Sequence, residues 1–236
     1  MNNHIEIAKR FINEEFSDCQ VALLAGSVVR GEATETSDLD IVIITEDERT
    51  PFRQSFFKHD WMIETFVFSM ESYKTFFEDD FKKRIPSIIQ MCQEGVIIKD
   101  TNDLSEIIKK DADEWMNKGV TPYSDKEIEA KRYMLTSIID DLIGCNDFEQ
   151  QIFIVNQMIE YTCNIILVTN GHWEAKGKWA QKLMKEFDPQ IYKEMITALN
   201  TFYKSEAKEP LIQFVEKELD KVGGRLFEGY YREARK

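Results

Sequence analysis

Residues 24–43 read LAGSVVRGEATETSDLDIVI and contain two short apolar runs joined by a polar connection. The first run, residues 20–25, is rich in Val and Leu and stops at Gly26, which predicts a buried strand. The second run, residues 39–45, is apolar and β-branched and predicts another strand. We expect a helix to begin at Ser27, directly after the first strand, and its first backbone N–H groups would then point at the turn.

The turn at Gly26 carries donors that suit a phosphate group. A helix N-terminus binds anions, and glycine lets a phosphate approach the backbone closely. Ser27 adds a hydroxyl group, and Arg30 adds a guanidinium group one turn later. The sequence has no G-x-x-x-x-G-K-[ST] motif, so this is not a Walker A loop. We therefore predict that Gly26, Ser27 and Arg30 form a phosphate-binding turn.

Asp38 and Asp40 stand two residues apart at the start of the second strand. Because side chains alternate along a strand, both carboxylates would lie on one face, where they repel each other and lose solvation. A divalent cation such as Mg²⁺ or Mn²⁺ removes that cost. Glu64 supplies a third carboxylate within residues 61–69, which otherwise predict a buried strand. The three converge if the strand of Glu64 lies beside that of Asp40 in matching register; the alternative is that Glu64 faces water on an edge strand.

The remaining chain divides into two parts with different patterns. Residues 1–110 predict an α/β domain, in which helices at 5–16 and 72–93 and a late strand at 95–100 flank a mixed β-sheet. After residue 100 strand signals nearly vanish, and residues 111–236 predict a helical bundle domain with Ser124 as a helix cap. The expected class is α+β. The expected helices of the second half are 104–117, 125–143, 148–170, 179–187, 190–203 and 209–222.

Composition limits the possible partners. The formal net charge of −13 disfavours broad nucleic-acid binding, and it suits a cationic acceptor or simply solubility. The four cysteines form no C-x-x-C motif and are expected to be free thiols in a reducing compartment. We see no targeting segment and no apolar stretch of the roughly 20 residues that span a bilayer. The sequence therefore predicts a cytoplasmic protein without a membrane partner.

The segments Gly26-Ser27, Ser37-Asp38-Leu39-Asp40 and Glu64 together resemble the signature of the DNA polymerase β-like nucleotidyltransferase superfamily. Within it, the pattern is similar to that of the small bacterial aminoglycoside and lincosamide nucleotidyltransferases. The resemblance covers residues 22–69. It implies that Ser27 and Arg30 hold a triphosphate, that Ser37 supports the nucleotide, and that Asp38, Asp40 and Glu64 are the catalytic metal ligands.

The reaction implied by this resemblance is transfer of a nucleoside monophosphate from an NTP, with ATP preferred, to a hydroxyl group of a small molecule. Two Mg²⁺ or Mn²⁺ ions would take part, and antibiotic resistance is the implied role. The resemblance also suggests a homodimer. It assigns the acceptor pocket to the helical half.

Several residues of the helical half are candidates for this pocket. Asp140 or Asp141 would act as a general base or bind a cationic group, the alternative being a solvated helix face. By resemblance, Lys176 or Lys178 would contact the phosphates. Trp173 and Trp179 would stack on a ring or pack between helices. Residues 78–80, Glu-Asp-Asp, are expected to be a solvated acidic run of the first half.

Two other functions fit the same motifs. One is nucleotidylylation of a protein, as in small nucleotidyltransferases paired with toxins. The other is a catalytically inactive nucleotide-binding protein, although no carboxylate of the motif is missing here. Polymerase or poly(A)-type activity is the least favoured, because the sequence shows no basic track for a nucleic-acid strand.

Overall fold

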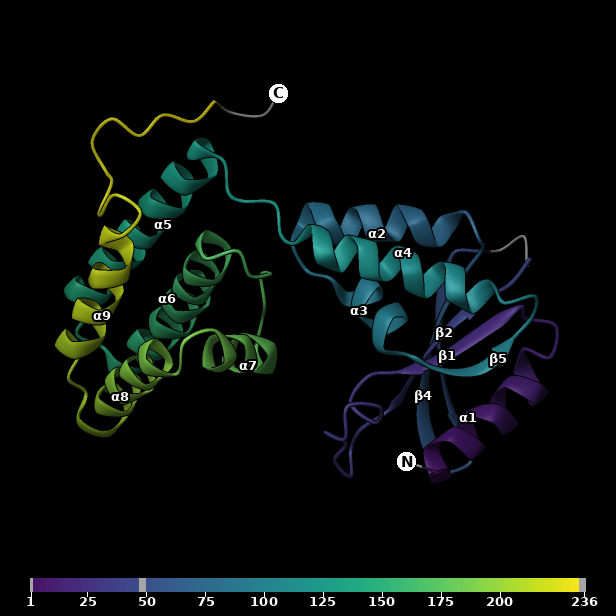
Figure 1. Cartoon of the computed structure of the whole chain (residues 1–236). Coiled ribbons are helices and arrows are strands. Elements are labelled where there is room, and N and C mark those ends of the chain that lie inside the picture. Colours follow the sequence, from purple (N-terminus) through teal and green to yellow (C-terminus); the bar gives the residue numbers. More distant parts are fainter. Residues whose placement is uncertain (1, 47–49, 234–236) are drawn as a thin grey trace. The chain divides into compact units, whose positions relative to one another are not determined.

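A computed structural model describes residues 2–46 and 50–233 of the chain. The chain forms two compact units, Met1–Gly119 and Val120–Lys236 (Figure 1). Helix α4 runs through the expected boundary between residues 110 and 111, because its periodic pattern continues to Lys118. The first unit therefore ends at Gly119, where φ is +72° and the backbone leaves the helix.

The first unit combines a five-stranded mixed sheet with helices, which confirms the predicted α+β class. The strand order is β3-β4-β2-β1-β5, in which β2 and β4 are parallel and the other neighbours are antiparallel. Its elements are α1 (Asn2–Glu15), β1 (Val21–Ala25), β2 (Leu39–Ile44), β3 (Phe52–Lys58), β4 (Trp61–Phe68), α2 (Ser72–Lys83), α3 (Ser87–Glu94), β5 (Val96–Asp100) and α4 (Leu104–Lys118).

Strands β1 and β2 are covered on both faces, which explains why their sequences are continuously apolar. Leu24 and Ile41 face a core shared with α1, whereas Leu23 and Val42 face a second core shared with α2, α3 and α4. Figure 1 shows α1 on one side of the sheet and the other three helices on the opposite side. The polar residues of β2 and β4 are therefore exceptions that need a separate explanation.

Strand β3 is absent from the sequence prediction. It is an edge strand whose side chains are mostly exposed, so its sequence lacks the apolar run that marks β1 and β2. It pairs with β4 through a tight hairpin in which His59 and Asp60 have φ values of +54° and +63°. Two central residues with positive φ are typical of a type I′ turn, although Asn-Gly is the commoner sequence there.

The acidic residues 78–80 behave differently from one another, so the expected solvated run is wrong for Asp80. Glu78 is exposed and Asp79 is half-buried, and they lie 3.5 and 4.0 Å from lysines one turn later. Asp80 is only 9% exposed, and its Oδ2 accepts the backbone N–H groups of Ile88 at 2.6 Å and Ile89 at 3.2 Å. These N–H groups belong to the first turn of α3 and would otherwise be unsatisfied. Asp80 thus caps a helix from outside it, and its burial raises its pKa to about 6.

The second unit is all-helical in the described residues. Its helices are α5 (Asp125–Gly144), α6 (Phe148–Thr169), α7 (Lys178–Phe187), α8 (Pro189–Ser205) and α9 (Glu209–Asp220). The expected cap at Ser124 is confirmed, since its side chain accepts the N–H of Glu127 and the Glu127 carboxylate accepts the N–H of Ser124. This reciprocal capping box starts α5.

Helix α6 is long and apolar enough to cross a membrane by length and composition, so the expectation that no segment reaches that length is wrong for α6. Half of its apolar stretch is buried within the protein. Met158 and Leu167, for example, are fully buried in the hydrophobic core of the helical unit. The same composition thus supports a central core helix.

All four cysteines are free thiols. Cys19, Cys92 and Cys163 are buried, and burial raises the pKa of each of the three thiols. Cys145 is only half-buried and lies at the end of α5.

Candidate metal and nucleotide site

The three predicted acidic side chains meet on one face of the sheet. Asp40 on β2 lies directly opposite Glu64 on β4 in the parallel register, and Asp38 precedes β2 by one residue. Asp40 and Glu64 share the face of Val42 and Phe66 because side chains alternate along each strand. One oxygen from each of Asp38, Asp40 and Glu64 lies within 4.8 Å of the other two.

The central carboxylate of this group is electrostatically unfavourable on its own. Burial first, and then the negative charges of Asp38 and Glu64, raise the pKa of Asp40, which reaches about 6. Arg30 and Arg53 act in the opposite direction without cancelling the effect. The carboxylates repel one another, and a bound cation would relieve this repulsion.

Glu64 is held by the edge strand that the sequence prediction missed. Ser55 on β3 donates its hydroxyl to Glu64 Oε1 at 3.3 Å, and the guanidinium of Arg53 pairs with Oε2. Arg53 also lies over the Phe66 ring, 4.8 Å from its centroid. The available signal was the short spacing between residues 52–58, with three phenylalanines, and the strand at 61–68, which is typical of a hairpin.

The segment after β1 is a hydrogen-bonded turn, so the expected helix at Ser27 is wrong. The N–H groups of Val29 and Arg30 both bond to the carbonyl of Gly26, at 3.2 and 3.3 Å, and the N–H of Glu32 bonds to the carbonyl of Ser27 at 2.9 Å, but residues 27–31 form turns and no helix. Two consecutive valines favour extended structure, and Gly31 has a φ of +73°, which ends the helical geometry. Phosphate binding at this turn therefore cannot rest on a helix N-terminus.

Gly26 has a role that the sequence did not reveal. Its φ is +78°, and a β-carbon added to it would lie only 2.0 Å from Oδ2 of Asp40. Glycine is thus required here because the Asp40 carboxylate packs against the Gly26 backbone. The Gly26 turn and the acidic cluster are consequently in direct contact.

The two predicted serines close the connection between β1 and β2. The hydroxyl of Ser27 donates to the hydroxyl oxygen of Ser37 at 3.2 Å, which in turn accepts the N–H of Thr34 at 2.8 Å. The bond between Ser27 and Ser37 thus links the two ends of the polar connection next to Asp38. The structure thus gathers all seven predicted site residues around the Gly26 turn and the acidic cluster.

Glu94 is the residue of this site that sequence reasoning missed. It is the last residue of α3, and its Oε1 accepts the N–H of Gly26 at 3.3 Å and pairs with the guanidinium of Arg30. Arg30 Nε also bonds to Glu32 at 3.0 Å. Because 64 residues separate Arg30 from Glu94, no local sequence pattern indicates the contact.

Three candidate residues of the helical unit, Asp140, Lys176 and Trp179, have neighbours within that unit. Asp140 pairs with Arg225, and Lys176 lies 3.8 Å from Glu160. Trp179 carries Lys182 over its ring at 5.2 Å. Lys178 is the first residue of α7. These residues lie in a different compact unit from the acidic cluster.

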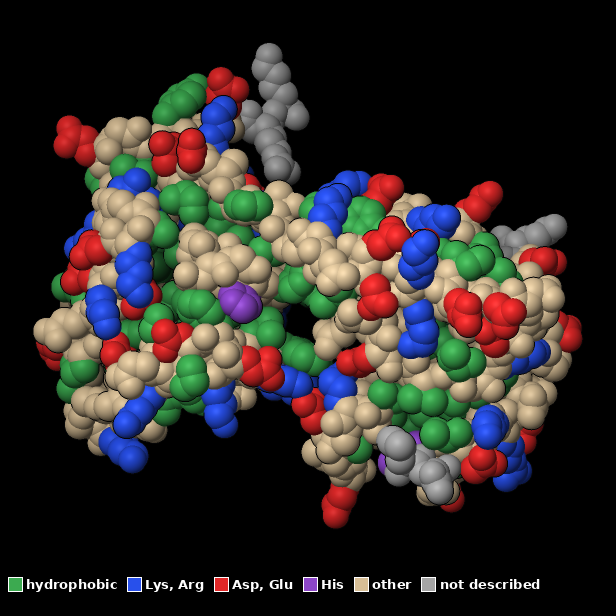
Figure 2. Space-filling model, viewed as in Figure 1, with side chains coloured by type: hydrophobic (Ala, Val, Ile, Leu, Met, Phe, Trp, Pro, Cys, Tyr) green, Lys and Arg blue, Asp and Glu red, His purple; other side chains and the backbone are tan. Residues whose placement is uncertain are grey.

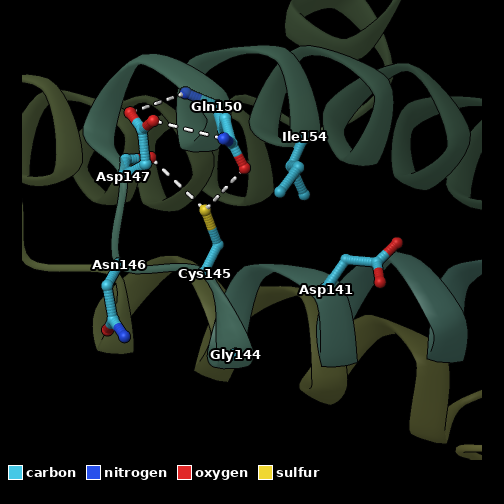
Figure 3. A pocket seen from close by; sticks show the side chains of 7 residues that line it. All are labelled: Asp141, Gly144, Cys145, Asn146, Asp147, Gln150 and Ile154. Atoms are coloured by element: carbon cyan, nitrogen blue, oxygen red, sulfur yellow. Dashed lines mark hydrogen bonds between the residues drawn. The ribbon is translucent and has the colours of Figure 1, made fainter.

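Asp141 lines a surface pocket of about 670 Å³ where α5 turns into α6. Figure 3 shows Asp141 on one side of this pocket and Cys145 near the Gln150 side chain. The thiol of Cys145 donates to the carbonyl of Asp147 at 3.3 Å. The pocket offers carboxylate and amide groups to a small polar molecule.

Comparison with known proteins agrees with this site. The family model described as nucleotidyltransferase domain matches residues 5–161, which is more than half of the chain and includes every residue of the acidic cluster and the Gly26 turn. Among solved structures, the chain is similar to a nucleotidyltransferase-like protein from Exiguobacterium sibiricum, with 14% identity and a TM-score of 0.48. That match covers 92% of this chain and 74% of the other. The search of curated proteins gave no match. By its family match, the chain belongs to the nucleotidyltransferase domain family, within the DNA polymerase β-like superfamily.

Proposed function

We propose that this protein transfers a nucleoside monophosphate from an NTP, preferentially ATP, to a hydroxyl group of a small molecule. One observation carries the proposal: the carboxylates of Asp38, Asp40 and Glu64 converge within 4.8 Å of one another beside the turn that holds Arg30. Family membership supports transfer of a nucleotidyl group in general. The arrangement of acids and donors supports the metal-assisted form of that reaction.

The donor set fits a small, hard divalent cation. All three candidate ligands are carboxylates, and the pKa of Asp40 is raised first by burial and then by the negative charges of Asp38 and Glu64. Mg²⁺ or Mn²⁺ ions, when bound, would neutralise the triphosphate and lower the pKa of the acceptor hydroxyl group. Asp40 must be ionised to ligate, and Ser55 and Arg53 orient Glu64.

The nucleotide would contact the side chains of the Gly26 turn. Ser27 offers a hydroxyl group and Arg30 a permanent positive charge, which suit the triphosphate. Ser37 holds Ser27 at the other end of the polar connection. In-line displacement at the α-phosphorus needs mainly positioning and charge neutralisation, and a turn clamped at both ends supplies positioning.

The acceptor is proposed to be small and to bind the helical unit. A net charge of −13 favours a cationic molecule such as an aminoglycoside, and such an acceptor would connect the protein with antibiotic resistance. Asp141 is a better candidate for the base than Asp140, because Asp140 is paired with Arg225. Figure 2 shows acidic and basic side chains interspersed on the visible face, without the continuous basic track that a nucleic-acid strand would need.

A panel of nucleotides and acceptors tests the proposal. Pyrophosphate release would be measured with ATP, GTP, CTP and UTP plus Mg²⁺, with aminoglycosides, lincosamides or proteins from a host extract as acceptors. We expect release that requires a small hydroxyl-bearing cation and stops when the metal is chelated. Label incorporated only into protein would instead indicate protein nucleotidylylation. Metal-dependent nucleotide binding without turnover on any acceptor would indicate a catalytically inactive binding protein.

A further inference from the structure

Glu94 contacts both the Gly26 backbone and the Arg30 side chain of the proposed nucleotide site. A single carboxylate oxygen accepts the backbone N–H of Gly26 at 3.3 Å and pairs with Nη1 of Arg30. The side chains of Glu94 and Arg30 are each only 18% exposed, so solvent screens this pair less than a surface ion pair. Neither the metal ligands nor the expected phosphate donors include Glu94.

The fold places Glu94 closely against β1. The next residue, Gly95, has no room for a side chain, since a β-carbon there would lie 2.7 Å from the Met91 carbonyl oxygen and 2.9 Å from Cβ of Leu23. This close approach brings the end of α3 onto the same sheet face that carries Asp40 and Glu64. Gln90 Nε2 lies 3.4 Å from the second oxygen of Glu94. The carboxylate is therefore held from its own helix as well as from the turn.

We propose that Glu94 is a positioning residue that preorganises Arg30 and the Gly26 turn for the triphosphate; this inference rests on the function proposed above. Glu94 engages Nη1 and Glu32 engages Nε, so the guanidinium plane is fixed at two of its nitrogens. A fixed arginine loses less conformational entropy when it binds a phosphate. The bond to Gly26 N–H fixes the same turn against which Asp40 packs.

A competing account makes the opposite prediction. If the Glu94 carboxylate merely occupied the place of a phosphate group, its removal would strengthen nucleotide binding. A positioning role means that its removal weakens binding, even though the site then carries one negative charge fewer. The sign of the change in Kd therefore separates the two accounts.

The experiment measures the Kd of a fluorescent ATP analogue with Mg²⁺ for the full-length wild type and for E94A, E94Q and E94D. Q93A is the matched control, because Gln93 is the neighbouring residue of α3 and bonds to Asp113. We expect E94A to raise the Kd about tenfold, as loss of a charged hydrogen bond does, and E94Q to stay within about threefold because it keeps the acceptor oxygen. E94D keeps the charge but retracts it by one methylene group, so we expect weaker binding. Q93A should bind like the wild type.

The link to Arg30 is tested by combining variants. If Glu94 acts through Arg30, the double variant R30A/E94A binds the analogue no more weakly than R30A alone. In turnover assays, KM for the NTP should rise more than kcat falls. Thermal unfolding of each variant identifies folded samples, and E94D and E94Q decide the question if E94A does not fold.

The outcomes separate this inference from the proposed function. Unchanged or tighter binding by folded E94A and E94D, with tight binding by the wild type, overturns the positioning role alone. A wild-type protein that binds no nucleotide in the presence of Mg²⁺ overturns both.

Discussion

Asp40 is the residue on which the site depends most, because it touches both of its parts. Its carboxylate lies between Asp38 and Glu64 and packs against Gly26, and its raised pKa reflects that confinement. A folded-state pKa above the ordinary value means that ionised Asp40 destabilises the metal-free protein, and a bound cation reverses the effect.

Replacing Asp40 should therefore separate activity from stability. We expect D40N to lower nucleotidyl transfer by more than about a hundredfold, because a metal ligand is lost. Its melting temperature without metal should equal or exceed that of the wild type at pH 7, since the ionised carboxylate is removed. E35Q, which alters an exposed acid of the same connection, is the control and should retain activity. Near-normal turnover by folded D40N would contradict the metal assignment.

Gly26 and Gly31 provide a second test at the residue scale. Both have positive φ, but a β-carbon at Gly26 collides with Asp40 whereas one at Gly31 has nothing within 4 Å. We expect G31A to lose about 1 kcal/mol of unfolding free energy from backbone strain alone. G26A should lose more, and it should also bind Mn²⁺ more weakly in calorimetric titrations. Equal effects of the two variants on Mn²⁺ binding would show that the contact between Gly26 and Asp40 is unimportant.

At the scale of the element, helix α3 makes a carboxylate contact at each of its ends. Asp80 caps its first turn, and Glu94, its last residue, holds the Gly26 turn. The helix is short, with eight residues, and isolated helices of this length are unstable. Its placement therefore depends on these end contacts and on packing against the sheet.

Removing the Asp80 cap should destabilise the first unit in a pH-dependent way. We expect D80A to lower the unfolding free energy by about 1–2 kcal/mol, whereas D80N, which keeps an acceptor oxygen, loses less. Burial raises the folded-state pKa of Asp80 from its ordinary value of 3.8 to about 6. The wild type therefore loses unfolding free energy as this carboxyl group ionises between about pH 4 and 6, whereas D80N has no carboxyl group to ionise. We expect the unfolding free energy of D80N relative to the wild type, measured with denaturant, to be higher at pH 7 than at pH 4.5. The same difference at both pH values would refute the raised pKa of Asp80.

The elements differ in how far the sequence could predict them. Strands β1, β2 and β4 were predictable because they are apolar and bounded by clear breaks, and the acidic cluster of Asp38, Asp40 and Glu64 followed from their alternation and register. Strand β3 was missed because an exposed edge strand needs no apolar pattern, and the helix at Ser27 was wrong because Gly31 stops it after one turn. Glu94 was not predictable, because α3 brings it to Arg30 from 64 residues away. Contacts made through tertiary packing leave no local signal.

At the scale of the whole molecule, the residues of the two proposed binding sites lie in separate units. The acidic cluster, the Gly26 turn and Glu94 all lie within Met1–Gly119, whereas the pocket at Asp141 lies within Val120–Lys236. The family match extends through α5 into α6, so the beginning of the helical unit belongs to the shared family pattern. Nucleotide and acceptor should therefore leave different footprints.

Hydrogen–deuterium exchange can read these footprints. With ATP and Mg²⁺, we expect added protection in peptides that cover residues 26–40, 62–66 and 90–95. A cationic acceptor should protect peptides near the turn between α5 and α6, and D40N should abolish the nucleotide footprint while leaving the acceptor footprint intact. Acceptor protection confined to the first unit would remove the helical unit from the proposed mechanism.

Because the four thiols differ in burial, one of them should be open to selective labelling with a dye. Three of the four sulfurs are shielded by core packing, whereas Cys145 is half-buried and borders a surface pocket. A maleimide dye added in slight excess to the native protein should therefore modify Cys145 first, without prior mutagenesis. Its emission would then report on ligands that enter the helical unit.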